Sequence, residues 1–451
     1  MPEKPSPLLL SAFVSASVEN VIHGTWRQPE SEQIKYNSID YWVDLAKLLE
    51  RGKFDLMFFA DVIGIQGPHR GDFRKTAESS IHFPVNDPST LAPVLAYVTE
   101  NLGIAFTSST LQEHPFNFAR RISTLDHISG GRVAWNIVTG AIENAAHNFG
   151  FAELTPHDQR YVWADEYVDV VYKLWEGSWD EGALLQDRAR GVHVEYEKIH
   201  QIDHEGPRYR VRGPHLSSPS PQRTPFLFQA GSSPAGRDFA ARNAEAIFFA
   251  TANLESVREQ VSDTRRRAES FGRLASDLKF FLGLHFVIGD TEAEALRKSD
   301  ELDEWIDYDA QLANLGGALN IDFGLYDLDT PIPEIQSEGV RGVASLITQS
   351  VSDRVPVVRD VARVITQDGR VVGTPEQIAD HLERLRDIGV DGINVFNTTR
   401  PGSYVEFIEY LTPVLQKRGL VKDEYEPGTL RNKIFGHDRL PDRHPATRYR
   451  G

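Results

Sequence analysis

The sequence predicts an α/β fold, a (β/α)8 TIM barrel with insertions, from three observations. Apolar runs rich in β-branched and aromatic residues recur eight times, separated by stretches of helical periodicity. The runs are continuously apolar, as expected for parallel strands covered on both faces. No Gly-x-Gly-x-x-Gly motif follows the first run, which weighs against the alternative, a doubly wound open sheet. The expected strands are residues 8–14, 54–61, 102–109, 132–139, 225–231, 244–250, 278–289 and 392–397.

The helical stretches between these runs carry start and stop signals. In the segment 374–392, Thr374 is an expected N-cap, Pro375 takes the first helical position, and Gln377 follows three residues after the cap. The segment 125–131 ends in two glycines, which is typical of a helix C-terminus. Strands that alternate with helices in this way favour the barrel.

Two segments interrupt this alternation within the single domain that we expect over residues 1–451. Residues 178–224 are rich in Gly, Pro, His and Ser, and the part from 193 to 213 has the pattern of a hairpin. Residues 314–372 form the second segment. Both are longer than ordinary loops of a compact domain, so we expect functional insertions. The C-terminal tail, residues 420–451, is polar and Arg-rich and is expected on the surface.

The composition excludes several classes of protein and site. Cysteine is absent, which rules out disulfides, thiolate nucleophiles and cysteine-based metal sites. The formal net charge is −17, and no cluster of Lys and Arg offers a basic face, so no nucleic-acid partner is expected. No apolar run is long enough to span a bilayer and no clear signal peptide begins the chain. We therefore expect a cytoplasmic protein without a membrane partner.

Polar residues stand near the C-terminal ends of several predicted strands, where a barrel places its active site. Asp61 ends the second strand, Thr107 lies near the end of the third, and Asn136 belongs to the fourth. Side chains alternate along a strand, so Asn136 points away from the side taken by Trp135 and Ile137. We expect Asn136 to face a ligand in the barrel mouth. An amide that only braces a neighbouring loop is the alternative.

Two further motifs favour the binding of an anion. In HDQRY, the i, i+3, i+4 spacing puts His157, Arg160 and Tyr161 on one helix face, a set suited to phosphate. In QAGSSPAG, Ser232 and Ser233 come directly before a proline at an expected helix start, where free backbone N–H groups attract anions. Ordinary capping roles are the alternatives for both motifs.

His23 and Trp26 lie in the loop after the first strand and are candidates to cover the pocket, with a plain surface loop as an equal alternative. The first strand carries no His-x-His pair, and we expect no metal site. Gly-x-Ser-x-Gly and the phosphate-binding loop Gly-x4-Gly-Lys-Ser/Thr are both absent. A metal-dependent barrel hydrolase is therefore a distant alternative.

These motifs together resemble the bacterial-luciferase-like flavin monooxygenases. Within them, the chain is most similar to the group of nitrilotriacetate monooxygenase component A, EDTA monooxygenase and dibenzothiophene-sulfone monooxygenase. The resemblance runs from about residue 8 to 420 and rests on FDLMFFAD, LGIAFTSST, ARRISTLDHISGGRVAWNIVTG, HDQRYVWADEYVDVVYKLWEG, PFLFQAGSSPAGRDFAA, YDLDTPIP and GINVFN.

The resemblance implies a barrel that oxidises a small organic substrate with O2, using FMNH2 from a separate NAD(P)H:FMN reductase. It also implies oxidative C–N or C–S cleavage, no metal, and a homodimer or homotetramer. A deazaflavin-dependent oxidoreductase and a non-catalytic flavin-binding barrel are the alternatives. His23 and Asn136 are the candidate catalytic residues. The implied FMN contacts are Asp61, Thr107, Asn136, His157, Arg160, Tyr161, Ser232 and Ser233.

Overall fold

The computed structural model describes residues 6–19, 21–140, 142–231, 233–249, 253–319, 321–332, 351 and 354–451. Eight parallel strands close into a barrel, because β1 pairs with both β2 and β13 and β10 pairs with both β9 and β11. All eight predicted runs form strands, so the barrel prediction is confirmed and the open-sheet alternative is wrong. The strands are β1 (Leu9–Ser15), β2 (Leu56–Ala60), β3 (Gly103–Ser109), β4 (Val133–Val138), β9 (Phe226–Gln229), β10 (Ala246–Phe249), β11 (Lys279–Ile288) and β13 (Gly392–Phe396).

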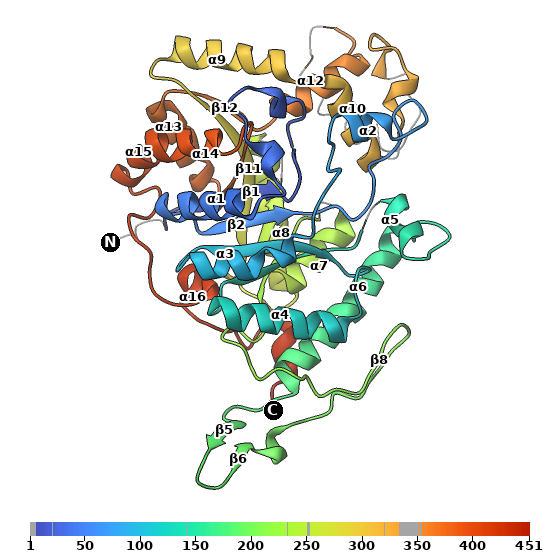
Figure 1. The fold of residues 1–451 in the computed structure, drawn as a ribbon, viewed down its shortest axis with the longest axis vertical. Helices are drawn as coiled ribbons and strands as arrows, with labels where there is room; N and C mark the ends of the chain where they lie inside the picture. The colour runs from blue at the N-terminus through green and yellow to red at the C-terminus, as the bar shows by residue number, and fades with distance from the viewer. Residues whose placement is uncertain are drawn as a thin grey trace.

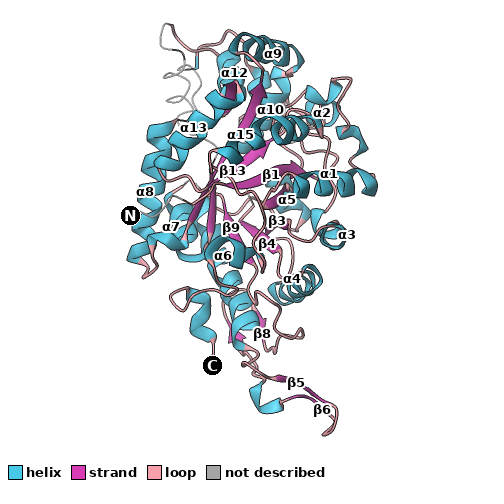
Figure 2. Cartoon of the chain, turned by 90° about the vertical axis from the view of Figure 1, so that its left-hand side faces the viewer, coloured by secondary structure: helices cyan, strands magenta, loops and turns pink. Residues whose placement is uncertain are grey.

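Helices surround the barrel, and Figure 2 shows the strands enclosed by them. The predicted caps are confirmed, since Thr374 and Gln377 form a capping box and Gly130 ends a helix with φ 64°. Within the described ranges, no helix has both the length and the apolar character needed to cross a bilayer. The described helices are α1 (Ile39–Arg51), α2 (Arg74–Glu78), α3 (Ala92–Val98), α4 (Pro115–Ser129), α5 (Glu143–Asn148), α6 (His157–Tyr172), α7 (Pro234–Asn243), α8 (Leu254–Ser270), α9 (Glu292–Trp305), α10 (Tyr308–Leu319), α12 (Val358–Gln367), α13 (Pro375–Asp387), α14 (Gly402–Glu406), α15 (Thr412–Lys417) and α16 (Leu430–Phe435).

The strand side chains divide into an outer and an inner core. Trp135 and Ile137 belong to the outer core between the strands and the helices. The inner core is dominated by phenylalanine, with the ring of Phe13 5.3 Å from that of Phe58 and 5.0 Å from that of Phe396. Because these rings fill the barrel below its mouth, the interior is a packed core and not a channel.

The segment 178–224 extends away from the barrel as two short hairpins, at the bottom of Figures 1 and 2. Strand β5 (Leu184–Asp187) pairs with β6 (Val192–Val194), and β7 (His204–Glu205) pairs with β8 (Arg210–Val211). The hairpin predicted over residues 193–213 is confirmed for β7 and β8, while the start of that range belongs to β6, which pairs with β5. A tight turn joins β5 and β6, in which the Asp187 carboxylate accepts hydrogen bonds from the N–H groups of Ala189 and Arg190.

The segment 314–372 begins inside α10 and includes α12 and the short strand β12 (Arg370–Gly373), which pairs with β11 outside the barrel. Helices α2, α10 and α12 lie together beside the barrel (Figure 1). The Asp322 carboxylate accepts hydrogen bonds from the N–H groups of Arg70 and Gly71, at 2.9 and 2.7 Å. This segment is therefore tied to the loop that follows β2. Residues 333–350, 352 and 353 lie outside the described residues.

The C-terminal segment closes the floor of the barrel, so the expectation of a surface tail is wrong for α16. Leu430 joins the inner core, and the Arg431 side chain is completely buried. The Arg431 guanidinium makes a two-pronged contact with the Glu245 carboxylate, at 2.6 and 2.9 Å. It also donates to the carbonyl oxygens of Gln222, Thr224 and Pro225. The arginine can be buried because segments distant in the sequence supply acceptors for its donor groups and a negative charge for its positive one.

We predict that Arg431→Met destabilises the protein by about 3–5 kcal/mol, because it leaves the Glu245 carboxylate buried without its cation. The melting temperature and the midpoint of urea unfolding measure the loss. Arg418→Met is the matched control, since Arg418 pairs with exposed Asp380 at the surface, where an ion pair contributes about 1 kcal/mol or less. Equal losses in the two variants would contradict the assigned role of Arg431.

Candidate active site

A cavity of about 290 Å³ opens at the C-terminal end of the barrel strands. This is the end at which barrel enzymes place their chemistry. A larger cavity, about 550 Å³, lies at the opposite end near Leu9, Lys279 and Asp391, where the strands begin and where barrel enzymes do not place their chemistry. The residues that line the smaller cavity are Asp61, Val62, Ile63, Ser109, Val138, Thr139, Gly140, Ile142, Ala145, Tyr161, Gln229, Ala230 and Gly231.

Asp61 contributes the carboxyl group of the cavity wall. It directly follows β2, and its Oδ1 accepts a hydrogen bond from the N–H of Val62 at 2.9 Å. Burial raises the pKa of the Asp61 carboxyl to about 7, and the Asp87 carboxylate adds to the rise. No lysine or arginine of the described chain forms an ion pair with Asp61. The group can therefore change its charge near neutral pH.

Asn136 faces the barrel interior, as the alternation along β4 predicted. Thr107 lies beside it in register on β3, and the Asn136 amide donates to Thr107 Oγ1 at 2.9 Å. The Thr107 hydroxyl in turn donates to the carbonyl oxygen of Phe59 at 3.0 Å. Asn136 Oδ1 is buried and has no hydrogen-bond partner among the described residues. The chain of donors thus leaves one open acceptor below the mouth.

The two predicted anion motifs come together at one edge of the cavity. His157 begins α6, Ser233 precedes α7, and His157 Nε2 lies 3.2 Å from Ser233 Oγ. The rings of His157 and Tyr161 are 5.2 Å apart, edge to face. Ser233 Oγ also accepts from the N–H of Gly236, which confirms its role as N-cap. Ser232 lies outside the described residues.

Gly231 and Gly236 allow the Tyr161 hydroxyl of α6 to lie close to the backbone at the start of α7. A Cβ atom at Gly231 would lie 2.8 Å from the Tyr161 hydroxyl oxygen, and one at Gly236 would lie 2.7 Å from it. The same Cβ atoms would lie 2.8 Å from the Cα of Gly236 and 2.9 Å from the Cα of Gly231, respectively, and such close contacts with backbone atoms do not occur in real proteins. Burial raises the pKa of the Tyr161 hydroxyl, which therefore remains protonated and able to donate.

Arg160 is the unsatisfied cation of this edge. Its side chain is buried, and Nε and Nη1 have no hydrogen-bond partner among the described residues. Burial lowers the pKa of the guanidinium, which means that the charged form is strained by lost hydration. Buried charges in proteins are normally paired, so a bound anion would relieve this strain.

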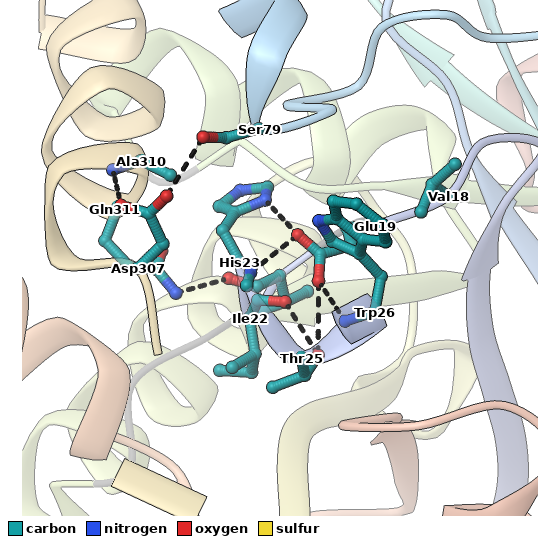
Figure 3. A network of polar contacts seen from close by, with 12 residues as sticks. Val18, Glu19, Ile22, His23, Thr25, Trp26, Ser79, Asp307, Ala310 and Gln311 are labelled. Carbon is teal, nitrogen blue, oxygen red and sulfur yellow. Dashed lines mark hydrogen bonds and ion pairs between the residues drawn. The ribbon is translucent and has the colours of Figure 1, made fainter. Parts of the chain in front are cut away.

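His23 is completely buried in the loop after β1, so the surface-loop alternative is wrong. Its Nδ1 lies 3.5 Å from Glu19 Oε2, and its carbonyl oxygen accepts from the N–H of Asp307 (Figure 3). His23 does not line the 290 Å³ cavity. Its ring meets that of His82 edge to face at 5.9 Å, and burial, with the His23 ring, lowers the pKa of His82 to about 3. His82 is therefore uncharged at neutral pH.

Glu19 is the residue of this region that the sequence analysis missed. Its carboxylate is fully buried and accepts from the N–H groups of Gly24 and Trp26, both at 2.8 Å. It thereby shapes the loop that carries His23 (Figure 3). The only signal in the sequence is the i, i+4 spacing of a glutamate and a histidine, which is common on solvated surfaces. Among the described residues, no group of three His, Asp or Glu side chains is arranged to hold a metal ion.

Residues 21–392 match the model of the luciferase-like monooxygenase family. The chain belongs to this family. It is 41% identical to long-chain alkane monooxygenase of Geobacillus thermodenitrificans, over 98% of this chain and 97% of the relative. The crystal structure of long-chain alkane monooxygenase superposes with a TM-score of 0.92 at 40% identity and covers 99% of this chain and 100% of that one.

Two further relatives show the range of the group. Dimethyl-sulfide monooxygenase of Hyphomicrobium sulfonivorans is 41% identical over 98% of this chain and 94% of the relative. Nitrilotriacetate monooxygenase component A of Aminobacter aminovorans is 35% identical over 92% and 94%. The predicted family and group are confirmed, and the chain is a flavin-dependent monooxygenase.

We predict that Asp61→Asn stabilises the protein at pH 8 but not at pH 4. The folded state raises the carboxyl pKa from 3.8 to about 7, so folding favours the protonated form. The cost of ionising Asp61 is absent below about pH 4, grows as the pH rises to about 7, and is constant above. Melting temperatures of parent and variant between pH 4 and 8 measure this, with Asp300→Asn, an exposed helix position, as control. A gain that does not depend on pH would contradict the assignment.

Proposed function

We propose that this chain is the oxygenase of a two-component monooxygenase, which takes FMNH2 from a separate NAD(P)H:FMN reductase and oxidises a small organic compound with O2. Oxidative cleavage of a C–N or C–S bond is the expected chemistry. The observation that carries the proposal is the buried Arg160, whose Nε and Nη1 have no partner among the described residues, on the same helix as Tyr161 of the cavity wall and His157, which contacts Ser233. The word "component" in the name of the nitrilotriacetate relative supports the two-component arrangement.

The edge of the cavity fits the phosphate of FMN. Arg160 would pair with the phosphate charge, while the hydroxyls of Ser233 and Tyr161 and the ring of His157 would donate hydrogen bonds. The free N–H groups at the start of α7 favour an anion at the same place. Charge-assisted hydrogen bonds of this kind contribute about 1.5–3 kcal/mol each.

The interior of the mouth fits the flavin ring. Asn136 Oδ1 is an open acceptor on β4 below the mouth, Thr107 holds the Asn136 amide in place, and Asp61 is able to give or take a proton near neutral pH. When bound, FMNH2 supplies the two electrons with which O2 is split, so that one oxygen atom enters the substrate and the other leaves as water. The chain keeps bulk water away, since the phenylalanine core seals the barrel from below.

His23 remains a candidate catalytic residue. It lies in the loop after β1, on the same side of the barrel as the cavity, and Glu19 fixes the backbone around it. A homodimer or homotetramer likewise remains a prediction.

The proposal predicts that turnover needs an added flavin reductase. Purified protein, NADH, FMN and O2 are combined with candidate substrates, with and without the reductase, and products are identified by mass. With the reductase we expect an added oxygen atom or a lost fragment, and without it no product. Turnover with NADH alone would contradict the two-component assignment. Hydride transfer with a deazaflavin would identify a different oxidoreductase, and FMN binding without any turnover would identify a flavin-binding barrel.

We predict that Asn136→Leu keeps the fold but loses oxygen transfer, because the open acceptor disappears while the volume changes little. Product per NADH should fall about tenfold or more, and hydrogen peroxide should rise in its place. Asn394→Leu is the matched control, since Asn394 is also a buried amide with an unpaired oxygen, but it lies on β13, a strand that contributes no residue to the cavity wall, whereas β4 contributes Val138. The role of Asn136 would be contradicted if Asn136→Leu formed as much product per NADH as the parent, or if both variants lost the same amount of product per NADH.

A further inference from the structure

The cavity that the proposed flavin would share with the substrate has walls that are uncharged apart from one carboxyl group. Among the described residues that line it, none is lysine, arginine or histidine. Ser109, Thr139 and Gln229 offer hydroxyl and amide groups, and the larger part of the wall is aliphatic, with Val62 and Ile142 among its members. The ionisable carboxyl is that of Asp61, which carries no positive charge in either form.

Two basic side chains of the described segments near the mouth, Lys75 and His82, add no free positive charge to this wall. Lys75 of α2 is paired with the Asp307 carboxylate at 2.7 Å. The ring of His82 is uncharged at neutral pH, and Ile81 packs in an apolar cluster with Ala310 and Ala313 of α10. Arg160 does not line the cavity, and its guanidinium is the proposed partner of the FMN phosphate.

An anionic substrate would meet two obstacles in such a site. It would lose its hydration without gaining a positive partner, which is costly for any buried charge. It would also lie near the Asp61 carboxyl and repel its ionised form. An uncharged molecule meets neither obstacle, since aliphatic walls and a few hydroxyl and amide groups are sufficient to bind it.

Resting on the proposed function, we propose that the substrate is an uncharged, largely apolar small molecule without a carboxylate, phosphate or sulfonate group. Two of the relatives, the long-chain alkane and dimethyl-sulfide monooxygenases, are named for uncharged compounds, and one, nitrilotriacetate monooxygenase component A, is named for a tricarboxylate. The cavity of this chain suits an uncharged compound better than a carboxylate.

Three thioethers of matched shape test the inference: methyl 3-methylbutyl sulfide, 3-(methylthio)propanamide and 3-(methylthio)propanoate. The amide separates the effect of charge from that of polarity. For each, thioether, O2 and FMNH2 would give either a one-oxygen product or a thiol and an aldehyde, together with FMN and water. Binding to the protein with FMN is measured by thermal shift, and kcat/KM is measured with the reductase present.

We expect the sulfide and the amide to bind and to react, and the carboxylate to show a kcat/KM about tenfold or more lower. Ile142→Arg, which adds a cation to the wall, should raise the kcat/KM of the carboxylate relative to that of the amide. Ile128→Arg, at an exposed position of α4, should not. The inference would be overturned if the parent protein showed a kcat/KM for the carboxylate equal to or above that for the amide, or if none of the three probes bound. Binding in the expected order without turnover would support it and would count instead against the proposed function.

Discussion

Closure of the eight parallel strands is the constraint on which the other features of this protein depend. Closure through the β1–β13 and β10–β11 pairings leaves no free edge among these eight strands and aligns all their C-terminal ends at one mouth. Asp61, Ser109 and Gln229 come from separate strands or strand ends, yet they line one cavity there because the strands are in register around a ring. The phenylalanines inside the ring supply the apolar volume that keeps it from collapsing or filling with water.

The buried polar groups are paired at one end of the barrel and partly unpaired at the other. At the floor, Arg431 and Glu245 satisfy each other and nearby carbonyl groups, so that a buried charge becomes part of the structure. At the mouth, Arg160 and Asn136 keep atoms without partners among the described residues, and Asp61 has a raised pKa. Polar groups left in this state cost stability, and a ligand that satisfies them recovers that cost as binding energy.

Local signals accounted for most of the framework and for part of the site. The capping residues Thr374 and Ser233 could be predicted because a cap is made within four residues of chain. The direction of Asn136 followed from the period of two along a strand. Its distance from Thr107 did not follow from that period, because it depends on the register between β3 and β4.

The sequence by itself determined the eight strands, the helix ends and the residue types at the mouth, since hydrophobic periodicity and capping are local properties. Tertiary structure alone decided which distant groups meet. Arg431 reaches Glu245 across 186 positions, and nothing in the C-terminal composition distinguishes it from the exposed arginines beside it. In the sequence, Glu19 likewise looks like an ordinary charged loop residue. In the structure, the segments packed around it, including Asp307 in contact with His23, exclude water from the side chains of Glu19 and His23. Burial and pairing depend on what the rest of the chain brings to a residue, and a local pattern carries no record of that.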